Sequence, residues 1–193
     1  IIANVSYKYG KEHFSLFYTG YSPAGYSFYY NGDLNGDGIK SDLMYIPKDD
    51  SEINFSSDAD RKAFWAFVNQ DKYLKNHKGE YAGAYSARAP FVHRFDIRWA
   101  HDFDVKIGNT SNRLQLSLDI MNVGNLFNSK WGVEKNMASC NNGQILKVVK
   151  VENNTPVYSM MKVNGEYPTE TWSFNHNYDQ CWKMQIGVKY YFN

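Results

Sequence analysis

The residues between Asp33 and Asp42 have the types and the spacing of a calcium-binding loop. Side-chain oxygens occur at the first, third and fifth positions, in Asp33, Asn35 and Asp37, and the sixth position is a glycine. Calcium prefers oxygen ligands, and a glycine at the sixth position permits the sharp turn of such loops. The main-chain carbonyl of Ile39 would supply the ligand of the seventh position.

The loop departs from the usual pattern at its end. Met44 stands at the twelfth position, where a glutamate is expected, and Asp42 at the tenth position is the candidate replacement. The same residue types also form plain polar turns, in which side-chain oxygens accept hydrogen bonds from main-chain N–H groups. The sequence therefore predicts a structural Ca²⁺ site that stiffens an exposed loop, with a polar turn as the alternative.

Other chemistry finds little support in the sequence. There is no GxSxG, HExxH, GxGxxG or P-loop pattern, and the five histidines are scattered. The two cysteines, Cys140 and Cys181, lack the spacing of a zinc site. The net charge of +1 gives no reason to expect a nucleic-acid partner. We expect a protein that is not an enzyme.

The elements that must carry these residues are strands. Alternation between apolar and polar side chains predicts strands at about 2–9, 13–21, 91–104, 113–123 and 182–192. Strands of about ten residues with one apolar face, one charged face and aromatic ends suit an outer-membrane β-barrel. The charged positions are expected to face its lumen, in cross-strand pairs or simply solvated: Arg94, Asp96, Arg98, Asp102, Asp119, Lys183 and Lys189.

The connections between these strands alternate between short and long. Short turns contrast with regions of about 22–90 and 124–181, as in barrels with short periplasmic turns and long extracellular loops. We expect a helix near 58–74 in the first loop and a hairpin from 145–152 and 157–163 in the second. With the C-terminus periplasmic, Cys140 and Cys181 fall on the outer side, where either a disulfide or two free thiols would be compatible with the sequence.

The predicted strands are too few for a complete barrel, because the smallest barrels have about eight strands. We therefore expect the chain to be a fragment whose N-terminus is an interior cut. The fold class predicted is all-β, an antiparallel transmembrane β-barrel segment made of these five strands and their long extracellular loops.

Four segments resemble a known family: residues 30–38 with 42–47, residues 87–98, residues 116–128 and residues 187–192. They are similar to the TonB-dependent receptors of the Bacteroidetes that carry a carboxypeptidase-regulatory-like N-terminal domain. The final residue departs from the pattern, because the chain ends in Asn193 and not in phenylalanine. The resemblance implies the last strands of a barrel of about 22 strands.

The resemblance also implies energised uptake of a nutrient, a peptide or an oligosaccharide. The expected partners are the remaining N-terminal part of the barrel with its plug, TonB through that part, a surface lipoprotein lid, outer-membrane lipid and the substrate. Aromatic loop residues would contact the substrate or seal the entrance: Tyr26, Tyr29, Tyr30 and Tyr81. The alternative is a soluble, calcium-binding, β-rich glycan-recognition module or surface adhesin.

Overall fold

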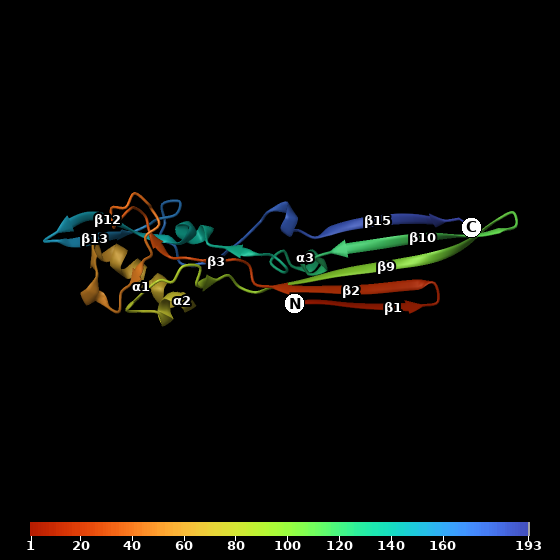
Figure 1. Cartoon of the computed structure of the whole chain (residues 1–193), viewed down its shortest axis with the longest axis horizontal. Helices are drawn as coiled ribbons and strands as arrows, with labels where there is room; N and C mark the ends of the chain where they lie inside the picture. The colour runs from red at the N-terminus through yellow and green to blue at the C-terminus, as the bar shows by residue number, and fades with distance from the viewer. Residues whose placement is uncertain (193) are drawn as a thin grey trace. The chain divides into compact units, whose positions relative to one another are not determined.

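The computed structural model describes residues 1–192 and is mostly β. The chain forms two units (Figure 1). The sheet unit consists of Ile1–Ser22, Phe91–Glu134 and residues 175–192. The insertion unit consists of Pro23–Pro90 and Lys135–Phe174, the two long segments between strands of the sheet unit.

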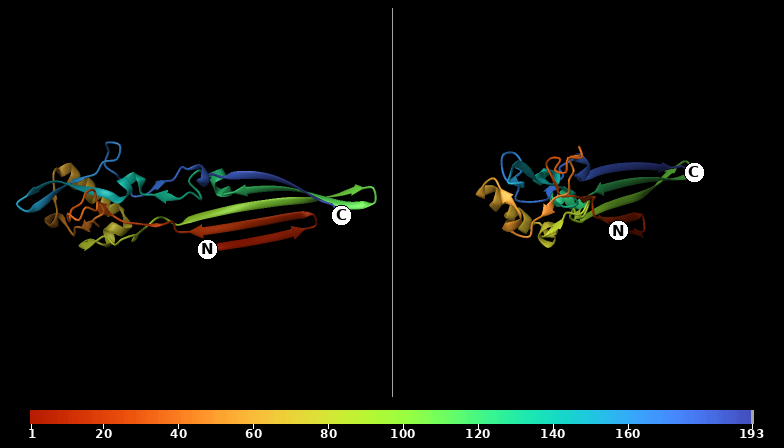
Figure 2. Two further views of the ribbon diagram at one scale, coloured as in Figure 1. Left: turned by 45° about the horizontal axis from the view of Figure 1, so that its top comes forward. Right: turned by 60° about the vertical axis from the view of Figure 1, so that its left-hand side comes forward.

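The sheet unit is an antiparallel sheet of five strands. In spatial order they are β1 (Ile2–Tyr9), β2 (Glu12–Tyr21), β9 (Val92–Ile107), β10 (Thr110–Met121) and β15 (Lys183–Tyr191). The views in Figures 1 and 2 show these strands as a single open layer, and β1 and β15 are its edges. Within residues 1–192 the sheet does not close on itself.

All five predicted strands are present, and the main difference lies at the second short turn. The prediction ended one strand near residue 104 and began the next near 113, but β9 and β10 extend the pairing to Ile107 and Thr110. Gly108, at a φ of +62°, lies in the tight turn between them. A positive φ costs glycine little, so the ladder continues to the turn itself.

The long segments of the chain leave from one end of this sheet. Tyr21 pairs with Val92, Ile97 pairs with Ile120, and Met121 pairs with Lys183, so the strand ends that flank both segments lie at the same end of the sheet. The short helix α3 (Val123–Phe127) and the 3-10 helix η3 (Tyr178–Gln180) lie next to those ends in the chain. No helix among the described residues is both long and apolar enough to cross a membrane.

The insertion unit contains the predicted helix, in two pieces. α1 (Asp58–Gln70) begins at Ser57, whose hydroxyl accepts a hydrogen bond from the Asp60 N–H at 3.1 Å. Asp71 then leaves the helical conformation and caps α2 (Lys72–Asn76) by accepting from two main-chain N–H groups. The predicted helix near 58–74 is therefore interrupted at Asp71, because that side chain competes for the N–H groups of the next turn.

The predicted hairpin is also present, as β12 (Gln144–Glu152) and β13 (Thr155–Met160). Its turn residues Asn153 and Asn154 both have positive φ, which asparagine tolerates better than most residues. The hairpin belongs to a sheet of order β4-β12-β13-β6. In this sheet β4 (Tyr29–Tyr30) pairs in parallel with β12, and β6 (Asn54–Phe55) pairs in parallel with β13.

The remaining elements of the insertion unit are short. They are β3 (Gly25–Tyr26), β5 (Tyr45–Ile46), η1 (Asp50–Glu52), β7 (Glu80–Tyr81), β8 (Ala87–Arg88), β11 (Lys135–Asn136), η2 (Ala138–Gly143) and β14 (Ser173–Phe174).

The two units differ in where their apolar side chains lie. The insertion unit has a core whose members are fully buried, including Phe28, Phe64, Leu74, Met137 and Leu146. Among the described residues of the sheet unit, the buried apolar ones are Val92, Ala100 and Val133. The insertion unit therefore has its own hydrophobic core, whereas most apolar side chains of the sheet are exposed.

Candidate functional site

One face of the sheet is apolar across all five strands. The register aligns Val5, Leu16, Ile97, Ile120 and Met184 in one transverse row. The neighbouring rows on the same face contain Tyr7, Phe14, Trp99, Leu118, Ile186, Phe103, Leu114 and Tyr190. Many are open to solvent; Ile186 is 69% exposed and Val5 is 68% exposed. Residues with apolar side chains are seldom left in such a continuous exposed surface without a partner.

The seven charged residues predicted to share a face do so. The register places Arg94, Asp96, Arg98 and Asp102 at even positions of β9, opposite odd positions of β10 that include Asp119. Asp119 is aligned with Gln185 of β15, so Lys183 and Lys189 belong to the same face. The Arg98 guanidinium lies 3.5 Å from the Asp119 carboxylate, as expected for a cross-strand pair.

Asp102 is the most densely bonded of these charges. It is 5% exposed and accepts a hydrogen bond from the Gln115 amide at 2.8 Å. The His13 ring nitrogen lies 2.9 Å from its other oxygen. Lys183 and Lys189, in contrast, form no ion pair within the described residues. The face therefore combines satisfied cross-strand pairs with free cations.

A polar network closes this face at the end from which the long segments leave. Arg94 donates to the Gly132 carbonyl at 2.8 Å and to Gln180, and the Asp96 carboxylate accepts from the Asn122 N–H at 2.6 Å. A side chain at Gly132 would come within 2.0 Å of the Asn122 amide oxygen. Sequence reasoning missed this network, because its members come from three separate segments.

The predicted calcium loop is held by its own hydrogen bonds. Both oxygens of Asp33 accept from main-chain N–H groups, at 2.7 and 2.8 Å, and an Asp42 oxygen accepts from the Leu34 N–H at 2.6 Å. Asn35 and Asp37 each accept from the N–H two residues on. These are the contacts of the polar-turn alternative.

The oxygen donors of this loop have the hardness that calcium prefers, but much of their capacity is used. Within residues 1–192 no group of three or more His, Cys, Asp or Glu side chains is placed to hold a metal ion. Calcium binding by Asp33, Asn35, Asp37, Ile39 and Asp42 stays a prediction.

The predicted loop lines a pocket together with tyrosines. Tyr30 and Tyr158 stack at 5.5 Å between ring centroids and are 7% and 9% exposed, whereas Tyr81 is 70% exposed. We call this the tyrosine pocket; its volume is about 620 Å³, and it is lined by Tyr30, Leu34, Asn35, Asp37, Ile39, Ser41, Asp42, Leu43, Tyr81 and Tyr158. Its charged residues are Asp37 and Asp42, so it suits a neutral or cationic polar ligand.

The tyrosine pocket keeps its buried hydroxyl in the neutral form. Burial raises the pKa of the Tyr30 phenol, and the adjacent Tyr158 raises it further. The Tyr30 oxygen accepts a hydrogen bond from the Tyr45 N–H at 3.3 Å. A neutral phenol and exposed aromatic rings beside carboxylates can hydrogen-bond to and stack on a polar, ring-shaped ligand such as a sugar.

Two of the four predicted aromatic residues lie elsewhere. Tyr30 and Tyr81 line the tyrosine pocket, but Tyr29 forms a bridge to Leu43 and does not line it. Tyr26 packs edge-on against Trp172, with ring centroids 5.4 Å apart. Tyr158, which sequence reasoning missed, takes part instead, because its strand β13 pairs with β12, and β12 pairs in parallel with β4.

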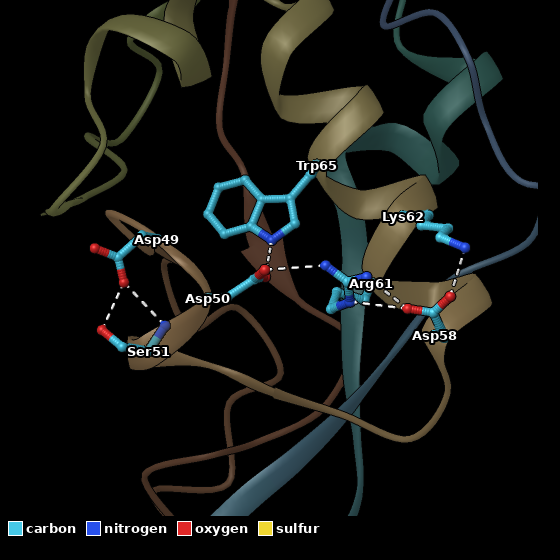
Figure 3. Close-up of polar contacts among 7 residues, drawn as sticks. All are labelled: Asp49, Asp50, Ser51, Asp58, Arg61, Lys62 and Trp65. Atoms are coloured by element: carbon cyan, nitrogen blue, oxygen red, sulfur yellow. Dashed lines mark hydrogen bonds and ion pairs between the residues drawn. The ribbon is translucent and has the colours of Figure 1, made fainter.

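A second polar cleft near η1 and the start of α1 contains charges that satisfy one another. Figure 3 shows Asp50 between the Trp65 ring nitrogen and Arg61, and Asp58 between Arg61 and Lys62. Lys62 and Arg61 lower the pKa of the Asp58 carboxyl. Because each of these charges has a partner, the cluster ties η1 to α1 and offers little to a ligand.

Both cysteines are free thiols, so the disulfide considered from the sequence is absent among the described residues. Cys140 is fully buried in the core of the insertion unit, and burial raises the pKa of its thiol to about 12. Cys181 belongs to the sheet unit and is exposed. A thiol with no accessible surface cannot be reached by a partner without local unfolding.

Comparison of the chain with protein-family models, with curated proteins and with solved structures gives no match.

Proposed function

We propose that the chain forms part of the wall of an outer-membrane transporter of the TonB-dependent kind, which takes up a peptide or an oligosaccharide. The five-stranded sheet spans the membrane, and the long segments between its strands lie outside the cell and contact the substrate. The observation that carries the proposal is the sheet itself, with one exposed apolar face and one charged face.

Lipid is the solvent that suits such an apolar face. No other described segment of the sheet unit covers the row formed by Val5, Leu16, Ile97, Ile120 and Met184. An acyl-chain environment removes that surface from water, with a gain of about 25 cal/mol per Å². The charged face then lies toward a wet interior, where Arg98 and Asp119 pair.

The unpaired edges of the sheet support pairing with further strands. β1 and β15 each have a neighbour on one side only. An open strand edge in lipid leaves main-chain N–H and C=O groups unsatisfied, at a cost of several kcal/mol each. In the proposed assembly, the remaining strands of the barrel pair with both edges, and the plug and the TonB contact belong to that remaining part.

The insertion unit supplies the ligand contacts in this proposal. It has its own core, and its tyrosine pocket combines exposed Tyr81, buried Tyr30 and two carboxylates. Such a pocket favours a hydroxyl-rich or amide-rich substrate over an anion. A surface lipoprotein would close over the same outer side, and structural calcium would stiffen the loop that begins at Asp33.

The test is a comparison of adjacent positions on the two faces. Single cysteines at Ile186 and Val188, and at the exposed neighbours Gln185 and Lys189 as matched controls, are labelled with an environment-sensitive fluorophore after reconstitution into vesicles. We expect blue-shifted emission and quenching by lipid-borne quenchers at the first pair, and quenching by aqueous iodide at the second. Cys140 and Cys181 are first replaced by serine.

Equal quenching at adjacent positions would refute the membrane placement. The polypeptide would then be expected to purify as a monodisperse species without detergent. That result would favour the alternative, a soluble recognition module whose ligand site is the tyrosine pocket.

A further inference from the structure

The insertion unit contains a further pocket, whose charge differs from that of the tyrosine pocket. It has a volume of about 370 Å³ and is formed by α2, β8 and the residues that follow Thr171. Its lining includes Lys72, His77, Arg88 and Trp172, together with the hydrogen-bonding side chains of Asn76 and Ser86. We call it the basic pocket.

The cations of the basic pocket have no protein partner. Lys72 and Arg88 are exposed, and neither forms an ion pair within residues 1–192. This distinguishes them from Arg61 in the cleft of Figure 3, which is bonded to two carboxylates. Two cations near one concavity repel each other, and an anionic ligand relieves that repulsion.

The one carboxylate in the lining is already committed to the fold. Asp71 is 5% exposed. One of its oxygens accepts from the N–H groups of Tyr73 and Leu74 at 2.9 Å, and the other accepts from the Thr171 hydroxyl at 2.6 Å. It therefore fixes α2 and the segment before Trp172, and leaves the positive charges of the pocket available to a ligand.

The aromatic and neutral polar groups indicate what else the ligand carries. The Trp172 ring lines the pocket and packs edge-on with Tyr26, and an indole ring offers a flat apolar surface. His77 Nδ1 lies 2.8 Å from the Tyr73 carbonyl, which can only accept, so Nδ1 carries a proton and Nε2 remains for a ligand. A neutral Nε2 accepts from a hydroxyl.

From this combination we infer that the basic pocket binds an acidic saccharide, with its carboxylate on Arg88 and Lys72 and its ring on Trp172. A guanidinium matches a carboxylate in a two-pronged geometry. Asn76, Ser86 and His77 meet the ring hydroxyls. The charge of the basic pocket is opposite to that of the tyrosine pocket, so the two sites select different chemical groups.

Titration calorimetry on the whole chain in detergent tests the inference. The probes are trigalacturonate, its full methyl ester and triaspartate. We expect trigalacturonate to bind about tenfold or more tightly than the ester, which has the same sugar chain, three added methyl groups and no charge. Arg88→Gln and Lys72→Gln should each remove most of that preference. Lys75→Gln, on the same short helix but outside the pocket lining, is the matched control and should retain it.

Any of four results would overturn the inference. They are equal affinity for trigalacturonate and its ester, unchanged affinity in both pocket variants, binding of triaspartate as tight as that of trigalacturonate, and absence of binding by all three probes. The face-specific labelling of Ile186 and Gln185 reports separately on membrane placement, so failure of one proposal is distinguishable from failure of the other.

Discussion

Replacement of Asp60 by alanine should destabilise the insertion unit more than any change at an exposed carboxylate. Asp60 lies in the first turn of α1 and is 5% exposed. Its carboxylate joins the helix to the β12–β13 hairpin and to the segment after it. The groups that donate to it are the hydroxyls of Ser56, Ser57, Ser159 and Tyr167 and the main-chain N–H of Met160.

The magnitude follows from which of these donors can find another partner. The Met160 N–H is buried and loses its acceptor, which costs about 1–3 kcal/mol. The hydroxyls of Ser56 and Ser57 are on exposed residues and can turn to water, so their loss is smaller. We expect Asp60→Ala to lower the free energy of unfolding by about 2–4 kcal/mol.

Asp60→Asn removes the negative charge and keeps nearly the same side-chain shape. The amide retains one oxygen, which can still accept from the Met160 N–H. Because hydrogen bonds to a charged group are stronger than those to a neutral one, we expect a loss of about 1–2 kcal/mol. Asp58→Ala is the matched control in the same turn. Asp58 is exposed and pairs with Arg61 and Lys62 at the surface, so its removal should cost under about 1 kcal/mol.

The same residue gives a pH dependence with a definite sign. Burial by itself would raise the pKa of the Asp60 carboxyl, but the hydrogen bonds from Ser57, Met160 and the other donors outweigh it, and the net pKa is lowered. The unfolded chain therefore binds a proton more readily. The stabilisation is present above the ordinary aspartate pKa of about 4 and is lost as pH falls through the folded-state value.

Hydrogen exchange followed by mass spectrometry measures these changes segment by segment. Peptides that cover β12, β13 and α1 are compared at neutral pH and near pH 3 for the wild type, Asp60→Ala, Asp60→Asn and Asp58→Ala. Equal protection of the Met160 region in the wild type and in Asp60→Ala would refute the reasoning. Persistence of the acid-dependent loss in Asp60→Asn would show that another carboxyl is responsible.

Three further predictions concern other parts of the chain. Asp33→Ala and Asp37→Ala should raise cleavage of the loop by protease to the level that a calcium chelator produces in the wild type; an unaltered wild type with chelator would contradict calcium binding there. Iodoacetamide near pH 8 should alkylate Cys181 and spare Cys140 until urea is added, as read by intact mass, because one thiol is exposed and the other is buried with its pKa raised; rapid double labelling, or a disulfide found by non-reducing mass analysis, would contradict it. Gly143→Ala should lower the free energy of unfolding of the insertion unit by on the order of 2 kcal/mol, seen as a lower urea midpoint, since φ is +94° and a Cβ would lie 2.3 Å from the Ser27 carbonyl oxygen; an unchanged midpoint would argue against that contact.

The sequence by itself was sufficient for the strands of the sheet unit. The side chains of a strand alternate between two faces. The pattern around Ile97 or Leu118 therefore predicts both the strand and which of its side chains share a face. The seven charged positions share a face for the same reason. Helix α1 was also predictable, because Ser57 and the apolar stripe through Phe64 and Phe67 are local signals.

The contents of the insertion unit depended on the tertiary structure. Tyr158 reaches Tyr30 because β13 pairs with β12 and β12 pairs in parallel with β4. Asp60 reaches Met160 across 100 positions of the chain. Trp172 and Arg88, which are also far apart in the chain, both line the basic pocket. No periodic pattern specifies which distant segments meet, since the two-residue strands involved are too short to carry one. The sequence thus determined the two faces of the sheet, because alternation is a local property of each strand. Only the folded chain decided how buried charges such as Asp60 are satisfied, because their contacts join segments far apart in the chain.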